Sequence, residues 1–314
     1  MGELRDIRGV STWHEVTGDG DSVVLLHGGF ANGDSFVLQV PALVEAGYEV
    51  FVPDRRGHGR SPDTDAPFTY ADMAQETIAY LEDIVGRPAH LIGFSDGGIA
   101  ALLVALARPD LLHRLVLIGT NFHRDGVHPI AEDFASPDNA FLGALYGAVS
   151  PDGAEHWPIV WQKTIDMQRR EPTLSPPDVA AIVAPTLVLV GDDDDIKLPH
   201  TRELFEAVPA GQIAVVPGAS HPVGSIGGAM SPAHDFLAGL NPDQAEAAVH
   251  GAGPLLVVAG PGSGKTPAPT PPTPPLTAQP PSPPQPLPPT FPTPATHQPH
   301  PPAPHPPPPP PLPP

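Results

Sequence analysis

The first 120 residues alternate short apolar segments with longer helix-like segments, and this alternation limits the possible folds more than any other feature. The short segments are residues 22–26, 48–52, 90–94 and 112–118, and none alternates apolar with polar positions. The helix-like segments are residues 35–46, 70–85 and 97–107. A strand that is apolar throughout is buried on both faces, as in a parallel sheet covered by helices on each side. The pattern therefore predicts an α/β fold with a mostly parallel sheet.

The pattern changes between Phe122 and about Ala181. This segment has no strand signal and contains several prolines, glycines and aromatic residues. Signals of strand, helix and strand then resume, and a last helix ends near Leu240; the three segments are residues 186–190, 199–208 and 213–216. We therefore predict a domain over residues 1–240, in which a helical cap at 122–181 is inserted between the strands at 112–118 and 186–190.

The last 48 residues differ in composition from the rest of the chain. From residue 267 onward, 27 of 48 residues are proline, and the segment contains no Lys, Arg, Asp or Glu. Proline lacks the backbone donor that helices and sheets need, and this segment offers little apolar surface to bury. We expect a disordered, proline-rich tail at 267–314 that could bind SH3-like or WW-like modules.

Charge and cysteine content exclude several classes of function. The formal net charge of −20 argues against general binding to nucleic acids or to an anionic membrane surface. A chain without cysteine has no disulfide, no thiol nucleophile and no thiolate metal site. The N-terminus lacks a signal-peptide pattern, and no segment approaches the roughly 20 apolar residues of a membrane helix. We therefore expect a cytoplasmic protein.

Residues 93–97 (GFSDG) place Ser95 between a predicted strand and a predicted helix. The G-x-S-x-G spacing fits a tight turn that exposes a nucleophilic serine, because side chains at Gly93 and Gly97 would clash there. The helix that follows directs its N-terminus toward the negative charge that develops in acyl transfer. We predict that Ser95 is the nucleophile of a serine hydrolase.

A serine hydroxyl needs an oriented histidine as its base. Along a chain with this type of turn, the acid and then the histidine follow the serine. His221 comes after the last predicted strand, whereas His200 and His234 lie inside predicted helices and are interpreted as surface residues. The acid is expected among residues 192–195 (DDDD), and periodicity does not choose among these four.

Two backbone N–H groups are needed to bind the oxyanion of such a reaction. One is expected from Asp96, the residue after the nucleophile, and the other from Gly29 or Phe30 in the loop after residues 22–26. His27 opens that loop and is expected to hold it in place by hydrogen bonds.

Five segments in this order resemble the α/β-hydrolase fold family: residues 25–29 (LLHGG), 53–61 (PDRRGHGRS), 93–97, 191–194 (GDDD) and 218–221 (GASH). The resemblance covers about residues 10–240 and implies the α/β-hydrolase fold, with helices on both faces of the sheet and a small cap. It implies that Asp194 is the acid, that Gly29 is the second oxyanion donor, and that residues 54–61 are structural. It also implies hydrolysis of a small-molecule ester or related acyl bond through an acyl-enzyme, without cofactor or metal.

Residues 93–99 (GFSDGGI) are also similar to the biphenyl-hydrolase-like and valacyclovir-hydrolase-like branch of that family. A carboxylate beside the nucleophile could bind a substrate ammonium group, as in α-amino acid esters, or Asp96 could simply cap the helix. In the cap, Trp157 and Trp161 lie four residues apart and would share a helix face. They either line an acyl pocket or pack the cap onto the core.

Residues 259–266 (AGPGSGKT) form a phosphate-binding-loop motif after the apolar residues 255–258. With the residues from 240 onward, the motif resembles the opening of UvrD/Rep-type DNA helicases, which implies ATP and Mg²⁺ as ligands. The residues that would bind them are Gln244, Ala259, Gly260, Gly262, Gly264, Lys265 and Thr266. The helix that must follow such a loop cannot form in the proline-rich sequence. We interpret 241–266 as a truncated, inactive fragment, joined to the hydrolase in a chimeric reading frame; a nucleotide-binding, helicase-like protein is the alternative hypothesis.

Overall fold

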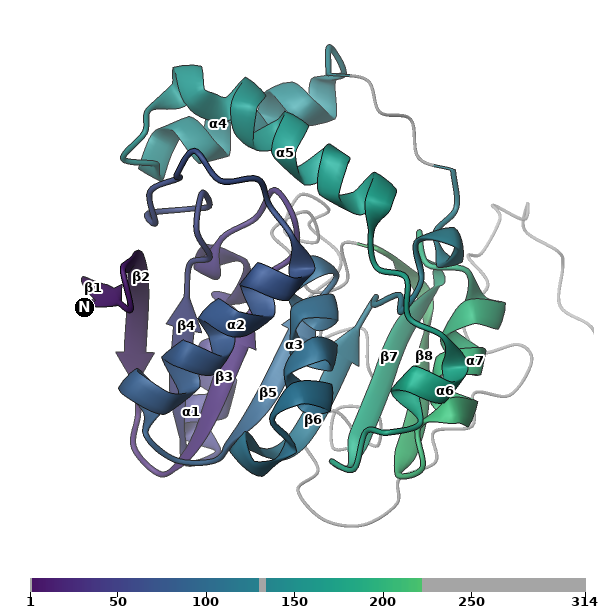
Figure 1. Ribbon diagram of the computed structural model, residues 1–314. Helices are drawn as coiled ribbons and strands as arrows, with labels where there is room; N and C mark the ends of the chain where they lie inside the picture. The colour runs from purple at the N-terminus through teal and green to yellow at the C-terminus, as the bar shows by residue number, and fades with distance from the viewer. Residues whose placement is uncertain (1, 130–133, 222–314) are drawn as a thin grey trace, which may run out of the picture. The chain divides into compact units, whose positions relative to one another are not determined.

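The computed structural model describes residues 2–129 and 134–221. Within these ranges, eight strands form one sheet in the order β1-β2-β4-β3-β5-β6-β7-β8 (Figure 1). Strand β2 pairs antiparallel with β1 and β4, and the pairs from β4 to β8 are parallel, which confirms a mostly parallel sheet. The strands are β1 (Glu3–Ile7), β2 (Val10–Thr17), β3 (Asp21–Leu26), β4 (Tyr48–Pro53), β5 (Ala89–Phe94), β6 (Leu112–Ile118), β7 (Thr186–Asp193) and β8 (Gly211–Ser220).

The sequence pattern predicted six of these strands and missed the hairpin of β1 and β2. The predicted segments correspond to β3 to β8, and β7 and β8 extend beyond their predicted ends. The residues of β1 and β2 are mostly exposed or half-buried. Polar side chains therefore interrupt the apolar run by which a strand buried on both faces is found.

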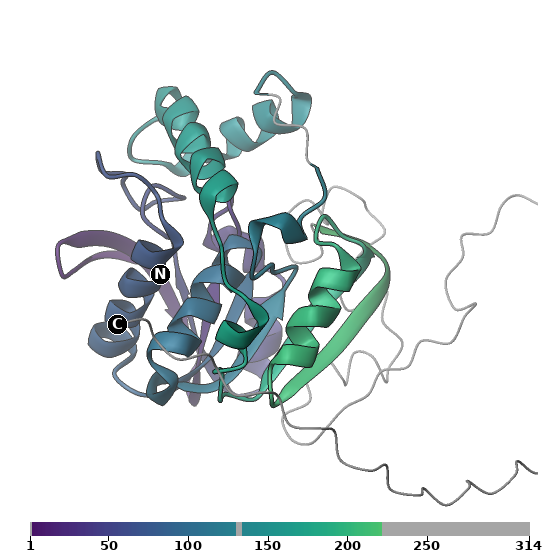
Figure 2. The same cartoon turned by 45° about the vertical axis from the view of Figure 1, so that its right-hand side comes forward.

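Helices cover both faces of the sheet (Figures 1 and 2). On one face, Val23 and Leu25 of β3 pack in a cluster with apolar side chains of α1. On the other face, Val24 and Leu26 join the cluster formed with α2, α3 and α7. Burial of each such side chain contributes about 1.5–3 kcal/mol to stability. These helices are α1 (Gln39–Glu45), α2 (Tyr70–Tyr80), α3 (Asp96–Ala107) and α7 (Leu198–Ala207), with the short α6 (Pro176–Val179) beside α7.

Two of the predicted helices differ in detail from the structure. The segment 35–46 does not form one continuous helix: a 3₁₀ turn, η1 (Gly33–Phe36), precedes α1, because the ring of Phe36 turns into the core at 2% exposure. Helix α2 continues as a π-helical turn, η2 (Leu81–Val85), and ends at Gly86 in the left-handed conformation with φ of +69°. A glycine is the residue that adopts this conformation without steric cost.

The carboxyl ends of the central strands lie in register. Leu26 of β3 is opposite Gly93 of β5, and Gly93 is opposite Leu117 of β6. Ile118 of β6 is in turn opposite Leu189 of β7. The loops that leave these four strands therefore emerge side by side at one edge, where open α/β sheets gather their functional groups.

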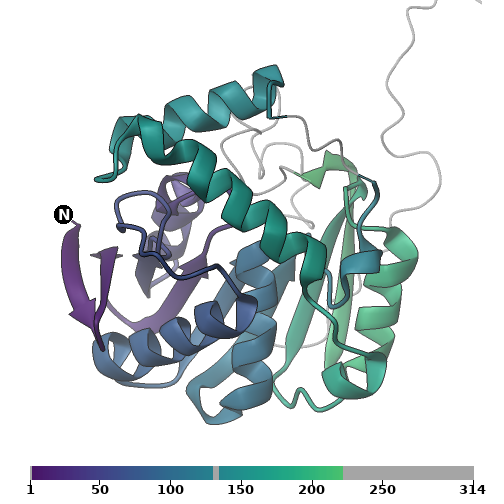
Figure 3. The same ribbon diagram turned by 45° about the horizontal axis from the view of Figure 1, so that its top comes forward.

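A helical cap lies over this edge (Figures 1 and 3). It consists mainly of α4 (Pro137–Val149), the short η5 (Ala154–His156) and α5 (Trp157–Arg170). Within the described part of residues 122–181 there is no strand, and two isolated β-bridges are the only sheet-like pairing. The 3₁₀ turns η3 (Pro109–Leu111) and η4 (Arg124–Gly126) flank β6. The predicted helical cap is confirmed, and its domain limits stay a prediction.

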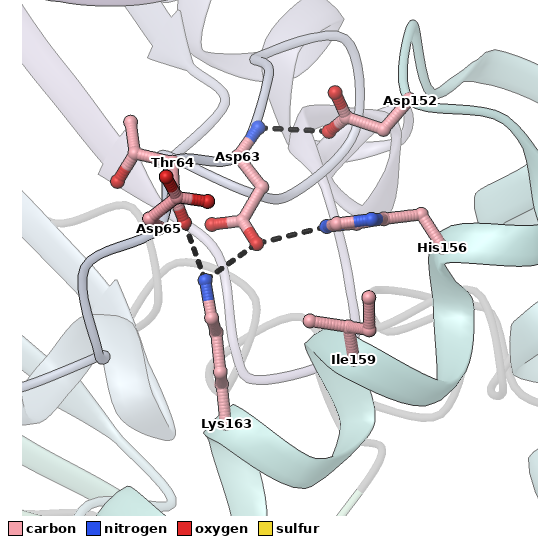
Figure 4. A pocket seen from close by; sticks show the side chains of 7 residues that line it. All are labelled: Asp63, Thr64, Asp65, Asp152, His156, Ile159 and Lys163. Carbon is pink, nitrogen blue, oxygen red and sulfur yellow. Dashed lines mark hydrogen bonds and ion pairs between the residues drawn. The ribbon is translucent and has the colours of Figure 1, made fainter.

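A buried carboxylate joins the cap to the core (Figure 4). Asp63, in the loop after β4, accepts hydrogen bonds through Oδ2 from His156 Nε2 at 2.9 Å and Lys163 Nζ at 2.7 Å. Its backbone N–H donates to Asp152 at 2.7 Å. Burial alone would raise the pKa of Asp63, but the hydrogen bonds from Lys163 and His156 outweigh it and lower that pKa. We call Asp63, His156 and Lys163 the cap tether.

The cap tether borders a cavity of about 270 Å³, lined by Asp63, Thr64, Asp65, Asp152, His156, Ile159 and Lys163 (Figure 4). None of the predicted site residues within the described ranges lines this cavity.

Three predicted segments lie outside the described residues. They are the last helix of the domain, the loop fragment at 241–266 and the proline-rich tail at 267–314. In the ranges that the structure describes, no helix combines the length and the apolar character needed to cross a membrane.

Candidate active site

Ser95 stands at the sharp turn between β5 and α3. Its φ is +52°, in a region of the backbone map that residues other than glycine rarely occupy. A Cβ at Gly93 would overlap the backbone of Gly97, and a Cβ at Gly97 would overlap the carbonyl of Leu26. The two glycines therefore let the turn close, and the closed turn holds Ser95 in a strained position at the start of α3.

Three side chains from separate loops meet at this turn. His221 directly follows β8, and its Nε2 lies 2.9 Å from Ser95 Oγ. Its Nδ1 lies 2.7 Å from Oδ1 of Asp194. The side chain of Asp194 is 1% exposed and that of His221 is 21% exposed. The structure thus brings Ser95, His221 and Asp194 together in one hydrogen-bonded chain.

Three of the four consecutive aspartates after Gly191 have different hydrogen-bond partners. The Asp194 carboxylate contacts the imidazole and also accepts from the backbone N–H of Ile196 at 2.9 Å. Asp192 instead accepts from the N–H of Gly218 at 2.7 Å. Asp195 uses its backbone carbonyl to accept from the N–H of His128 at 2.8 Å. Geometry therefore selects Asp194, the aspartate that the family resemblance implied.

Burial and hydrogen bonding act in opposite directions on the pKa values of this pair. Burial alone would lower the pKa of His221, but the hydrogen bond and charge of Asp194 outweigh it and raise that pKa. Burial alone would raise the pKa of Asp194, but His221 and the N–H groups of Ile196 and Gly191 lower it. The carboxylate therefore stays ionised and stabilises the protonated imidazole.

Two residues that the sequence patterns did not single out shape the space around His221. Gly119, directly after β6, has φ of +52°, and a Cβ there would lie 3.1 Å from Nδ1 of His221. The ring of Phe94 packs beside the imidazole with a centroid distance of 5.2 Å. A glycine directly after a buried strand is the signal by which Gly119 could have been found.

The loop after β3 lies against the same turn. A Cβ at Gly28 would lie 3.3 Å from Cβ of Ser95, and a Cβ at Gly29 would meet the carboxylate of Asp96. The N–H of Asp96 is in the first turn of α3, where a helix has no internal acceptor to offer. The structure therefore brings Gly29 and Asp96, the two predicted oxyanion donors, next to each other, and it brings Gly28 next to Ser95.

The carboxylate of Asp96 does not cap the helix, so that interpretation is wrong. Ser95 occupies the N-cap position, and Asp96 is the first helical residue, with only 3% of its surface exposed. Its Oδ1 accepts a hydrogen bond from Tyr70 Oη at 2.7 Å, and the amide of Gln168 donates to Oδ1 and Oδ2 at 3.1 and 3.2 Å. The carboxylate turns away from the backbone because these two distant side chains bind it; neither was predicted.

The two cap tryptophans pack against other aromatic rings. The Trp157 ring contacts Phe30, in the loop after β3, at a centroid distance of 5.7 Å and Tyr146 of α4 at 5.4 Å. Trp161 packs edge-on against Phe134 at 5.1 Å. Trp157 therefore connects the cap to the loop beside Ser95, whereas Trp161 packs within the cap.

His200 is not the surface residue that its helical position suggested. Its side chain is 10% exposed, and its ring stacks on Phe122 with centroids 4.0 Å apart. Its Nε2 accepts from the backbone N–H of Phe122 at 3.2 Å. Burial lowers the pKa of His200 to about 4, so the ring is neutral and holds the connection that leads into the cap. His234 lies outside the described residues.

The described residues contain no group of three or more His, Cys, Asp or Glu side chains placed to hold a metal ion. The residues predicted to bind ATP and Mg²⁺, from Gln244 to Thr266, lie outside the described ranges. That hypothesis therefore stays a prediction.

Similar proteins include hydrolases of several kinds. The chain is 28% identical over 254 residues to the sn-1-specific diacylglycerol lipase ABHD11 of Mus musculus, covering 65% of this chain and 77% of that protein. It is 25% identical over 235 residues to the serine hydrolase BPHL of Homo sapiens, covering 68% and 78%. The crystal structure of CarC, a serine hydrolase involved in carbazole degradation, superposes with a TM-score of 0.59 at 20% identity, covering 70% of this chain and 91% of that one. This structural likeness shows the shared fold.

The model of the alpha/beta hydrolase family matches residues 23–224. The matched range contains Ser95, Asp194 and His221, together with most of β3 and all of β4 to β8. The chain is an enzyme of the hydrolase class, and it belongs to the alpha/beta hydrolase family.

Proposed function

We propose that this chain is a serine hydrolase that cleaves an ester bond of a small molecule through an acyl-enzyme intermediate. The observation that carries the proposal is the hydrogen-bonded chain from Ser95 through His221 to Asp194, with distances of 2.9 and 2.7 Å. A serine on a strained turn with an imidazole in reach of its proton is an activated nucleophile. The reaction uses only groups that this chain supplies, so it needs no cofactor.

In the first half of the reaction, Nε2 of His221 takes the proton of Ser95 while Oγ attacks the carbonyl carbon of the ester. The imidazolium is stabilised by Asp194, which raises the pKa of the ring. The N–H groups of Gly29 and Asp96 bind the oxyanion of the tetrahedral intermediate. The proton then passes from His221 to the leaving alcohol, and the acyl group stays on Ser95.

The second half reverses these roles. His221 takes a proton from a water molecule, whose oxygen attacks the acyl carbon, and the same N–H groups bind the second oxyanion. The proton returns from His221 to Ser95 Oγ as the acyl–oxygen bond breaks. The carboxylic acid leaves, and the hydrogen-bonded chain is restored.

A finer proposal concerns the substrate: we propose esters that carry an α-ammonium group. Asp96 is the residue after the nucleophile, and the groups bound directly to its carboxylate, Tyr70 and Gln168, are neutral. A carboxylate in this position would attract a substrate cation within reach of the scissile carbonyl. The similarity to the serine hydrolase BPHL agrees with the branch that the sequence of residues 93–99 resembles.

The nucleophile is tested with Ser95→Ala and a fluorophosphonate probe. We expect the variant to lose labelling and about 10⁶-fold of the hydrolysis of a p-nitrophenyl ester, with an unchanged circular dichroism spectrum. Ser11→Ala, on strand β2 of the N-terminal hairpin, is the matched control and should keep both. Labelling or hydrolysis that persists in Ser95→Ala would contradict the proposal.

The substrate class is tested with matched esters that differ only in the α-amino group. We expect the amino esters to be preferred, and we expect Asp96→Asn to reduce kcat/KM for them by about ten- to a hundredfold, the range of a charged hydrogen bond. The neutral esters should lose less. Asp193→Asn, at an exposed position, is the control. Equal losses on both ester series in Asp96→Asn would refute the α-ammonium proposal and leave Ser95 untouched.

A further inference from the structure

We infer that Arg55 is a positioning residue that orients the Gly29 N–H toward the oxyanion by holding the carbonyl of Gly28. The inference rests on the proposed function and adds a role for a residue of the 54–61 motif, for which the family resemblance implies a structural role only. Arg55 follows β4, and it is buried, with 6% of its surface exposed.

Two donors converge on the Gly28 carbonyl. Nη2 of Arg55 donates to this oxygen at 2.7 Å. Nδ1 of His27 lies 2.8 Å from the same oxygen. A carbonyl bound by two buried donors, one of them charged, is fixed more firmly than a carbonyl with a single neutral partner.

The protonation state of His27 follows from its second partner. Nε2 of His27 accepts a hydrogen bond from the backbone N–H of Arg55 at 3.0 Å, so this nitrogen carries no proton. Nδ1 must then carry the proton and donate it to the Gly28 carbonyl. Burial, together with the charge of Arg55, holds the pKa of His27 well below its ordinary value, so the ring stays in this neutral form.

The peptide that these donors hold is the one that carries the proposed oxyanion donor. In a trans peptide the carbonyl and the N–H point in opposite directions, and the bond between Gly28 and Gly29 is trans. Fixing the Gly28 carbonyl toward Arg55 therefore aims the Gly29 N–H away from Arg55. A peptide plane between two glycines needs such a constraint, because no side chain limits its rotation about the bonds to the two Cα atoms.

The charge of Arg55 also has an electrostatic consequence at this site. Among the described residues, no carboxylate lies within ion-pair distance of its guanidinium, and burying a cation in this way is costly. The negative charge of Asp96 is close enough to stabilise the guanidinium, and Asp96 also lies against Gly29. Arg55 thus weakens the repulsion between this carboxylate and an oxyanion bound at Gly29, without forming an ion pair that would neutralise Asp96.

The matched pair for the test is Arg55→Met against Arg56→Met. Arg56 stands in the same motif and is equally buried, but its guanidinium binds Glu76 and Thr64 and forms no hydrogen bond to the loop after β3. Each variant is assayed for kcat and KM on a p-nitrophenyl ester, for inhibition by a trifluoromethyl ketone, and for its melting temperature. The ketone forms an oxyanion on a nucleophilic serine, so its affinity reports the oxyanion site.

We expect Arg55→Met to lower kcat by about ten- to a hundredfold. This loss is no larger than that from removing an oxyanion donor outright, because the Gly29 N–H is still present. Affinity for the trifluoromethyl ketone should fall by a similar factor, while KM stays nearly unchanged. Arg56→Met should leave kcat and the affinity for the ketone unchanged, although its melting temperature should fall about as much as that of Arg55→Met. If Arg55→Met does not fold, Arg55→Lys replaces it and should show the same pattern, because an ammonium group lacks the planar, extended reach of the guanidinium.

Equal kcat and equal ketone affinity in the Arg55 and Arg56 variants would overturn the inference. A loss in Arg55→Met that appears in KM alone would overturn it as well. Failure of the proposed function itself has a different signature. In that case wild-type hydrolysis does not depend on Ser95, and the ketone does not bind to any of the proteins.

Discussion

Two aspartate–histidine pairs with buried carboxylates, both among the described residues, look alike and differ in what surrounds them. Asp194 and His221 lie 2.7 Å apart at the nucleophile turn, and Asp63 and His156 lie 2.9 Å apart in the cap tether (Figure 4). Both carboxylates are almost fully buried, with side-chain exposures of 1% and 2%. Both histidines are partly accessible, at 21% and 26%.

The difference lies in the remaining partners of each pair. The second ring nitrogen of His221 faces the hydroxyl of Ser95, whereas a lysine, Lys163, shares the carboxylate oxygen that His156 binds. A neighbouring cation satisfies the charge of Asp63 permanently. The charge of Asp194 instead has its main partner in an imidazole that gains and loses a proton. An aspartate–histidine pair is therefore a structural link or a catalytic one according to its third partner.

The largest expected effect separates the two histidines. His221→Gln removes the proposed base and should lower kcat for ester hydrolysis by about 10⁶-fold. His156→Gln keeps an N–H that can bind Asp63, and its kcat should stay within about threefold of the wild type. Initial rates on one ester measure both. A large loss of kcat in His156→Gln would show that the tether acts in the chemistry and would break the comparison.

Substitution of the two aspartates should separate their kcat values by a smaller factor than substitution of the two histidines does. Asp194→Asn leaves the imidazole without its charge partner and should cost about 10⁴-fold in kcat. Asp63→Asn should keep kcat within a few fold but lower the free energy of unfolding by about 1–3 kcal/mol, because buried hydrogen bonds to Lys163 and His156 weaken. Urea unfolding followed by circular dichroism measures this loss. An Asp63→Asn protein as stable as the wild type would contradict the tether.

Two glycines with left-handed backbones sharpen the same contrast. Gly119 has φ of +52° beside His221, and Gly153 has φ of +81° in the cap before His156, where an added Cβ would meet nothing within 4 Å. Alanine at either position should cost about 1–3 kcal/mol of stability through backbone strain. Gly119→Ala should also lower kcat about tenfold by displacing the imidazole. Equal activity in the two variants would mean that the ring tolerates the added methyl group.

The smallest effect is a shift in the pH profile. His221 acts as a base only when it is neutral, so kcat/KM should fall as the pH drops through its pKa. Asp194 raises that pKa, which places the midpoint above the ordinary histidine value of 6.5. Asp194→Asn should move the midpoint to lower pH, whereas Asp63→Asn should leave it in place. Rates measured from pH 5 to 9, as a working range of about four units around that value, test this. A midpoint that moves in both variants would contradict the separation of the two pairs.

The sequence predicted the elements whose signals are local. The predicted strand at 112–118 has the same bounds as β6, and Gly86 ends the helical segment that begins at Tyr70, as predicted. The hairpin of β1 and β2 was missed because it lies at the edge of the sheet, where polar side chains face solvent. The helix predicted over 35–46 was broken because Phe36 is drawn into the core. Local sequence patterns predict a helix or strand correctly where neighbouring residues determine it. They fail where contacts with distant parts of the chain determine it.

Local sequence also predicted one part of the candidate site, and contacts between distant residues determined the rest. The sequence by itself determined the turn at Ser95, since glycines two residues to either side are a steric requirement of that turn. Tertiary structure decided which of four aspartates meets His221, and it turned the carboxylate of Asp96 toward Tyr70 and away from the helix end. It also placed Arg55 on the carbonyl beside Gly29. These contacts join residues far apart in the chain, and hydrogen bonding across such distances leaves no periodic signal in a sequence.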